Sequence, residues 1–301
     1  MMRDLRPLLR KAYRALPFKK SVFDCIKLIG TPPKAVTKHL YFDGFFDVAM
    51  SRGETFRFLA HGTQIDNELY WYGLYGGWER CSQRMWVELC RDSQVIVDIG
   101  ANDGLYCLAA RTVNSRARII AAEPLDFILV RLKANIEANR FADIDLVETA
   151  FSNYTGDAEM FVPIDADYVR SATVNTNLLD RPAEAVKAKA IKVQTFKSYF
   201  DQAGLDRLDL VKMDVESHEP EVLEGFGDLL GKHKPTILAE VSYKRVPDLL
   251  NEILRPYGYL YFNINENSGM HQQDSLTLSE SDNFLICQPE VAKRYGLAGC
   301  E

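Results

Sequence analysis

The stretch Val95-Ile-Val-Asp-Ile-Gly-Ala-Asn-Asp-Gly-Leu105 decides the fold of this 301-residue chain. An apolar run containing one acid leads into two glycines that enclose Ala-Asn-Asp, and an apolar helical pattern follows from Leu105 to Ala110. This order predicts a buried strand, a glycine turn and a helix. Such a unit places a small ligand against backbone amides at the start of a helix, where the helix dipole favours negative charge.

The glycine spacing separates this turn from a dinucleotide-binding turn. Dinucleotide sites use G-x-G-x-x-G, whose middle glycine makes room for a pyrophosphate. Here three residues separate Gly100 from Gly104, and two of them are Asn102 and Asp103. Polar side chains at the tip suit a ligand with an ammonium and a carboxylate, such as S-adenosylmethionine. We expect a Gly100→Val variant to fold but not to bind this ligand, because the new side chain would stand where the ligand approaches the backbone.

A second acid follows at the spacing expected in such a fold. Arg118-Ile-Ile-Ala-Ala-Glu123 predicts another buried strand, and Pro124 opens the next helix. In doubly wound folds, an acid at the end of the second strand holds the ribose hydroxyls of a nucleoside. The alternative is a turn that only packs a helix on the sheet, with Glu123 a solvated strand end. The predicted cofactor-binding residues of the two turns are Asp98, Gly100, Asn102, Gly104 and Glu123.

Composition limits the class of protein. With 47% hydrophobic and 26% charged residues, the chain is globular and can bury a full core. Its net charge of −6 argues against a nucleic-acid-binding surface. The six cysteines show neither a C-x-x-C pair nor zinc spacing, as expected of reduced cysteines in a cytoplasmic protein. The sequence contains neither an apolar run of ~18 residues nor a secretory signal.

The charge is unevenly distributed. Residues 1–20 carry seven Lys/Arg and one Asp, a net charge of +6, which leaves −12 for the remainder. Residues 1–30 predict two short amphipathic helices. This stretch either contacts an anionic membrane surface or is a solvated helix packed on the domain. A homo-oligomer is also left open.

The order of predicted elements indicates an α/β fold. Residues 1–77 form an expected N-terminal appendage, with a small hairpin layer at 40–75, and residues 78–301 form the main domain. Strand and helix alternate after the helix at 78–91, which implies a doubly wound, mainly parallel sheet covered on both faces. Residues 152–190 are expected to be irregular, residues 219–230 to form one helix, and strands 258–264 and 283–288 to form a C-terminal antiparallel hairpin. The remaining predicted strands are 94–99, 118–122, 144–151, 190–195, 208–214 and 235–241.

The chain resembles the FkbM family of S-adenosylmethionine-dependent methyltransferases over roughly residues 90–290. The resemblance is carried by Val97-Asp-Ile-Gly-Ala-Asn-Asp-Gly104, Ala122-Glu-Pro124, Leu210-Val-Lys-Met-Asp-Val-Glu-Ser-His-Glu219 with Val222-Leu-Glu-Gly225, and Pro235-Thr-Ile-Leu-Ala-Glu240. Ser217 stands where the family usually has glycine. The resemblance implies a Rossmann-like class I methyltransferase fold, O-methylation of a sugar, glycolipid or polyketide-like small molecule, and a role for Glu79 near the methionine end of the cofactor.

Methyl transfer to an alcohol needs alignment and the removal of a proton. The methyl donor is already activated, whereas the alcohol requires a general base or a metal ion. Asp214 is expected at a strand end, with Glu216 and His218 on the loop after it and Glu240 at the end of the next strand. We predict Asp214 and His218 as catalytic residues. A hard cation such as magnesium is possible but not favoured, because one acid per strand end supplies few ligands for a metal site.

Each of these residues also has a plainer interpretation. Asp214 could cap a helix, and His218 could be a partner of Glu219 or Glu221. Phe151 and Ser152 end the strand beside which adenine usually lies, so we predict that they bind the cofactor, although Phe151 could equally be a core residue. Two rival functions are a nucleotide-dependent oxidoreductase, which the missing G-x-G-x-x-G disfavours, and a non-catalytic interaction module.

Overall fold

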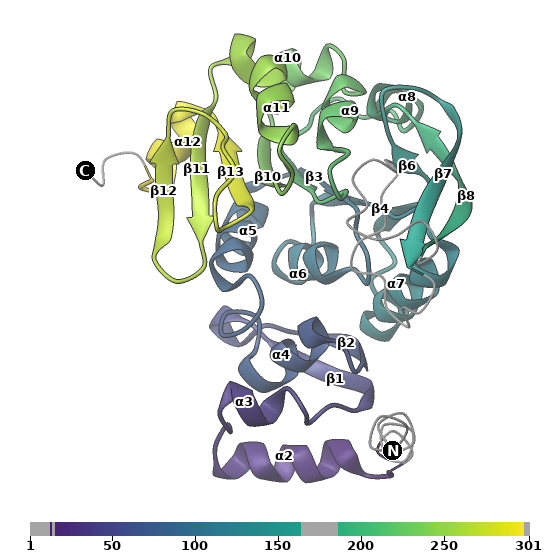
Figure 1. Cartoon of the computed structure of the whole chain (residues 1–301), viewed down its shortest axis with the longest axis vertical. Coiled ribbons are helices and arrows are strands. Elements are labelled where there is room, and N and C mark those ends of the chain that lie inside the picture. The colour runs from purple at the N-terminus through teal and green to yellow at the C-terminus, as the bar shows by residue number, and fades with distance from the viewer. Residues whose placement is uncertain (1–12, 14–15, 164–185, 298–301) are drawn as a thin grey trace. The chain divides into compact units, whose positions relative to one another are not determined.

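The computed structural model describes residue 13 and residues 16–163 and 186–297. The chain divides into two compact units, Met1–Arg80 and Cys81–Glu301 (Figure 1). The basic stretch 1–20 lies largely outside the described residues. Within the described part of the chain, none of the helices is both long and apolar enough to cross a membrane.

The first unit is a two-stranded sheet with short helices. Strands β1 (Asp43–Ala49) and β2 (Thr55–His61) pair antiparallel, and alternate residues are buried, as expected of a sheet with one covered face. Phe46, Phe58 and Tyr70 form the centre of an aromatic core. The other elements are α2 (Lys19–Ile29), α3 (Lys34–Thr37), the short 3₁₀ helix η1 (Ser51–Gly53) and α4 (Gln64–Tyr72).

Helix α4 corrects one prediction, because residues 64–72 were assigned to the hairpin layer. The aromatic residues of this stretch suggested strand, but Thr63 caps a helix. Its side chain accepts a hydrogen bond from the backbone N–H of Asp66 at 3.2 Å. Capping and the burial of Leu69, Tyr70 and Trp71 override the strand preference of the aromatic side chains.

The second unit is built on an eight-stranded sheet of order β12-β11-β13-β10-β9-β3-β4-β5. Strands β5, β4, β3, β9 and β10 are parallel, so their carboxyl ends meet at one edge. Figure 1 shows helices on both sides of this sheet. Its strands are β3 (Val95–Ile99), β4 (Arg118–Ala122), β5 (Ile144–Val147), β9 (Leu210–Met213), β10 (Thr236–Glu240), β11 (Leu260–Asn265), β12 (Gly269–Gln273) and β13 (Asn283–Cys287).

The helices of this unit follow the predicted alternation, with one difference. The predicted helix 219–230 is two helices, separated where Gly225 packs against Ser152 so closely that a Cβ would lie 2.0 Å from the Ser152 carbonyl oxygen. The helices are α5 (Arg80–Asp92), α6 (Leu105–Val113), α7 (Asp126–Asn139), α8 (Phe196–Gln202), α9 (Glu219–Glu224), α10 (Leu229–His233), α11 (Val246–Leu254), η4 (Arg255–Tyr257) and α12 (Pro289–Arg294).

The antiparallel C-terminal strands are confirmed, with a refinement. Strand β13 lies between β10 and β11 and is antiparallel to both. Strand β11 forms its hairpin with β12, which was not predicted. The sequence Gly269-Met-His-Gln-Gln273 shows no regular apolar alternation, because this edge strand buries little.

A small second sheet of order β6-β8-β7 corrects the expected irregular stretch 152–190. Strand β6 (Ala150–Phe151) is separate from β5, and β7 (Gly156–Pro163) pairs antiparallel with β8 (Val186–Gln194). The predicted strand 190–195 overlaps the second half of β8. The rest of the pair was not predicted, because polar residues interrupt the apolar pattern, although Val162, Ile191 and Val193 are buried on one face. Residues 164–185 lie outside the described residues.

Candidate active site

The glycine turn between β3 and α6 is held by backbone contacts on both sides. The N–H groups of Gly100 and Ala101 both donate to the Ala122 carbonyl at 3.0 Å. Gly100 has φ +78°, and a Cβ there would lie 2.0 Å from the Asp214 carbonyl oxygen. Gly104 has φ +92°, and a Cβ there would lie 2.4 Å from Leu132 Cδ1. Packing against the backbone therefore requires Gly100, whereas Gly104 is favoured mainly by its positive φ, because the end of the Leu132 side chain can move. The backbone clash at Gly100 contradicts the expectation that Gly100→Val folds normally.

The two predicted turns meet through the Glu123 carboxylate. Its Oε2 accepts from the Asn102 N–H at 3.1 Å, and its Oε1 accepts from the Leu125 N–H at 3.0 Å. Glu123 is only 5% exposed, which excludes the alternative of a solvated strand end. Burial raises the pKa of Glu123 to about 7.

Asp98 is the second buried acid at this end of the sheet. Its Oδ2 accepts from the Cys107 N–H in the first turn of α6 at 2.9 Å. Burial raises the pKa of Asp98 to about 7, although the positive charge of Lys212 opposes the shift. This carboxylate therefore fixes the start of α6 relative to β3.

Asn102 gives this turn an unused acceptor. It has φ +50°, a conformation that asparagine tolerates better than most side chains. Its Oδ1 is buried and has no hydrogen-bond partner among the described residues. Buried polar atoms are normally satisfied, so an unpaired one at a turn indicates a missing donor. The ammonium and ribose hydroxyls of S-adenosylmethionine are such donors, and the turn therefore fits this cofactor.

Three carboxylates gather at the ends of β9 and β10. One oxygen each from Asp214, Glu216 and Glu240 lies within 4.8 Å of the others. The fully buried Lys212 places its Nζ 3.4 Å from Asp214 Oδ2 and 4.8 Å from the ring centre of Tyr106. Lys212 therefore offsets part of the negative charge of these acids.

The pKa values of the three acids are shifted in different directions. Partial burial works to raise the pKa of Asp214, but Lys212 and a hydrogen bond from Glu240 outweigh it and hold that pKa below its usual value. The charge of Asp214, followed by burial, raises the pKa of Glu240 to about 11. Burial, then Asp214, raises the pKa of Glu216 to about 8. Asp214 is thus an ionised acceptor beside a neutral Glu240, and a hard cation could replace the retained protons.

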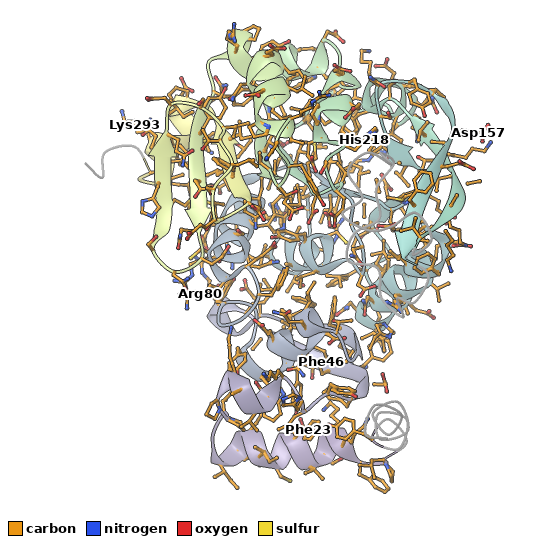
Figure 2. The ribbon with its side chains drawn as sticks, in the orientation of Figure 1. Phe23, Phe46, Arg80, Asp157, His218 and Lys293 are labelled. Carbon is orange, nitrogen blue, oxygen red and sulfur yellow. The ribbon has the colours of Figure 1, made fainter. Side chains whose placement is uncertain are left out.

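His218 lies apart from this cluster. Its Nε2 is 3.0 Å from Ser152 Oγ, and its Nδ1 is 3.5 Å from Glu221 Oε2. Figure 2 labels His218 where α9 faces the small sheet. Burial lowers the pKa of His218. These contacts favour the interpretation that the sequence left open, in which His218 is a partner of Glu221.

Comparison with known proteins identifies the domain. The profile of the methyltransferase FkbM domain matches residues 98–261, more than half of the chain. The chain belongs to the FkbM methyltransferase domain family. The sheet order, with antiparallel β13 inserted between β10 and β11, confirms the predicted Rossmann-like class I methyltransferase fold.

Several curated proteins share part of this sequence. The AMB antimetabolite synthetase AmbE of Pseudomonas aeruginosa is 30% identical over 55% of this chain, which spans only 9% of AmbE. Methyltransferase 1 of Beauveria bassiana is 23% identical over 46% of this chain and 60% of its own length. The 31-O-demethyl-FK506 methyltransferase FkbM of Streptomyces tacrolimicus is 26% identical over 60% of this chain and 78% of its own length.

Solved structures show more distant likeness. The methyltransferase FkbM of Methylobacillus flagellatus matches at 23% identity, covering 65% of this chain and 44% of that chain, with a TM-score of 0.42. A SAM-dependent methyltransferase of Agrobacterium tumefaciens matches at 11% identity, covering 81% and 70%, with a TM-score of 0.43.

The structure also places the other three predicted cofactor-binding residues, Phe151, Ser152 and Glu79. Phe151 is 1% exposed, and its ring packs against Phe196 and Tyr199, which favours the core role left open by the sequence. Ser152 is fully buried and bonds His218. Glu79 belongs to the first unit, in the turn before α5 at φ +47°, and its contact with the cofactor stays a prediction.

Two features of the site were missed or left unexplained by the sequence. Lys212 is one such residue, because a lysine inside the apolar strand Leu210-Val-Lys-Met213 signals a buried charge partner. Ser217 replaces the usual glycine and has φ +77°. This left-handed backbone conformation explains why the family usually has glycine here. Glu219 Oε1 accepts from the Ser217 N–H at 3.3 Å and steadies this loop.

A cavity of about 540 Å³ lies in the first unit and is separate from the strand-end residues. Its lining includes Lys34, Lys38, Gln64 and Glu68. It has no part in the site described above.

Proposed function

We propose that this protein is an S-adenosylmethionine-dependent O-methyltransferase that acts on a hydroxyl of a sugar, glycolipid or polyketide-like small molecule. The observation that carries the proposal is the Glu123 carboxylate, which is buried and oriented by the Asn102 and Leu125 N–H groups. When it is ionised, a carboxylate fixed in this way can accept hydrogen bonds from two ribose hydroxyls.

The acceptor side of the site rests on Asp214. S-adenosylmethionine supplies a methyl group that is already activated, so the protein needs to orient the acceptor oxygen and receive its proton. Asp214 is ionised beside Lys212, half-buried, and follows β9 at the carboxyl edge of the sheet. A hydroxyl that hydrogen-bonds to Asp214 would have an oriented oxygen and a nearby proton acceptor.

The choice of oxygen as acceptor atom has two supports. Carboxylates, rather than a cysteine or an amide pair, gather at this strand end. The printed name of the Streptomyces relative describes methylation of an oxygen. Because the chain spans 60% or less of some relatives, their acceptors do not identify the acceptor of this protein.

The experiment is a binding assay followed by a turnover assay. Calorimetry with S-adenosylmethionine and with NAD should show one tight site for the former and none for the latter. Incubation with S-adenosylmethionine and a panel of sugar, glycolipid and polyketide alcohols should add the mass of one methyl group to one class. Binding of NAD instead would indicate an oxidoreductase, and failure to bind either would indicate a non-catalytic interaction module.

A further inference from the structure

Two charged side chains of helix α2 (Lys19–Ile29) contact other elements of its own unit. Lys27 Nζ donates to the Tyr70 carbonyl at 2.6 Å, and the Tyr70 hydroxyl donates to Asp24 Oδ1 at 2.7 Å. Phe23, on the same side, is 5% exposed and packs against Trp71. These contacts fix which face of the helix is covered.

The opposite face of α2 is apolar and exposed. Val22 is 55% exposed, Ile29 is 92% exposed, and Cys25 between them is also exposed. Phe18, at the helix start, is 78% exposed. Positions 18, 22, 25 and 29 lie along one stripe at the helical period, and Leu28 flanks it at 88% exposure. An ordinary surface helix buries its apolar stripe against the protein, whereas α2 exposes this stripe to solvent.

This clustering is local to the N-terminal unit. Among the described residues, five large apolar side chains exposed by more than half lie between positions 16 and 29, and only Val130 reaches that exposure elsewhere. Single exposed apolar residues need no explanation, whereas a contiguous group marks an interaction surface.

The charge of the surrounding sequence indicates the partner. Residues 1–38 carry ten Lys/Arg and two Asp, a net charge of +8, against −14 for the rest of the chain. A basic segment with an apolar helical stripe is the composition of a helix that lies in the plane of an anionic bilayer surface. A second copy of this chain is a poorer partner, because the two strongly basic segments would repel each other.

We propose that α2 binds an anionic lipid surface, with Phe18, Val22, Leu28 and Ile29 entering the headgroup boundary. The basic segment would supply attraction to the lipid phosphates. The proposal concerns the first unit and does not depend on the proposed methyltransferase activity.

Vesicle sedimentation of the full chain tests the proposal. The protein should sediment with phosphatidylcholine vesicles that contain phosphatidylglycerol at least about fivefold more than with phosphatidylcholine alone, and less at high salt. A variant with Val22→Ser, Leu28→Ser and Ile29→Ser should lose this binding. The matched control, Val130→Ser with Leu249→Ser, changes two exposed apolar residues of the other unit and should bind normally.

Two outcomes would overturn the proposal. One is equal sedimentation of the α2 variant and the parent protein with anionic vesicles. The other is a vesicle-free dimer, seen by sedimentation velocity, that the α2 substitutions abolish, since this would make a second copy the occupant.

A fluorescent label on Cys25 gives an independent reading. With Cys81 and Cys300 replaced by serine, Cys25 is the exposed thiol that remains among the described residues, because Cys90, Cys107 and Cys287 are buried. An environment-sensitive dye there should shift to the blue with anionic vesicles. An unshifted emission in protein that sediments with the vesicles would mean that another surface binds lipid.

Discussion

The buried acids have different partners in the two halves of the strand-end site. At the carboxyl ends of β3 and β4, each of two carboxylates accepts from backbone N–H groups: Asp98 from Cys107, and Glu123 from Asn102 and Leu125. After β9 and β10, the carboxylates of Asp214, Glu216 and Glu240 face one another within 4.8 Å.

This difference separates a preformed binding site from an adjustable reactive one. Backbone donors cannot titrate or move far, so the first half holds its geometry before a ligand arrives. The second half depends on which acid keeps a proton, because neighbouring carboxylates cannot all be ionised at low cost. We therefore propose that the first half binds the cofactor and that the second half transfers the proton.

The largest expected effect is at Gly100, where the two halves touch. Gly100→Ala would push a Cβ against the Asp214 carbonyl oxygen and should lower the free energy of unfolding by more than about 4 kcal/mol. Gly204→Ala is the matched control, because Gly204 has φ +61° but nothing within 4 Å of its Cβ position. It should cost only about 1–2 kcal/mol. Equal urea-unfolding midpoints for the two variants would show that the turn shifts to accommodate the new Cβ.

The next effect is on turnover. Asp214→Asn keeps the size of the side chain but removes the proton acceptor, so turnover with a verified acceptor should fall about 10²–10⁴-fold. Affinity for S-adenosylmethionine should stay within about threefold, because its binding groups are on the other half. His218→Gln serves as the comparison, since its ring bonds Ser152 and Glu221. If His218→Gln loses more turnover than Asp214→Asn, the imidazole is the base.

The third effect is a pH dependence that belongs to Glu240. Its pKa is raised to about 11, so the folded protein keeps a proton that the unfolded chain has released above its ordinary pKa. Stability should therefore fall as pH rises, by about 1.4 kcal/mol per pH unit relative to Glu240→Gln. Urea unfolding of both proteins between about pH 7.5 and pH 9.5 measures this difference.

Magnesium serves as the control for that experiment. Millimolar MgCl₂ should leave the difference between the two proteins unchanged if protons satisfy the cluster. If magnesium stabilises only the protein with Glu240, a cation occupies the three carboxylates, and the assignment of retained protons is wrong.

The smallest effect is at Ser217. Because Ser217 has φ +77°, Ser217→Gly should raise the free energy of unfolding by about 1 kcal/mol. Thermal unfolding measures this gain in stability, and the rate of methyl transfer should stay unchanged. A destabilised variant would mean that the serine side chain makes contacts worth more than the backbone strain.

The first half of the site was largely predictable, and the second half was predictable in part. Local order in Val95–Leu105 and Arg118–Glu123 determines where the acids and glycines fall, because each turn follows its own strand. The sequence also placed Asp214, Glu216 and Glu240 at the ends of neighbouring strands, which the pairing of β9 with β10 confirms. Which of these acids keeps a proton depends on distances that the sequence does not contain. Burial of Lys212, the partnership of His218 with Ser152, and the clash behind Gly100 are tertiary facts of the same kind.

The account's central claim is that the half built on β3 and β4 holds the methyl donor. The most direct test is calorimetric titration of S-adenosylmethionine into the parent protein, Glu123→Ala and Glu240→Gln. Glu123→Ala loses two charge-assisted hydrogen bonds, so its affinity for S-adenosylmethionine should be at least tenfold weaker, a loss on the order of 2–4 kcal/mol. The affinity of Glu240→Gln should stay near the parent value. Unchanged affinity in Glu123→Ala, or a loss confined to Glu240→Gln, would contradict the division of labour between the two halves.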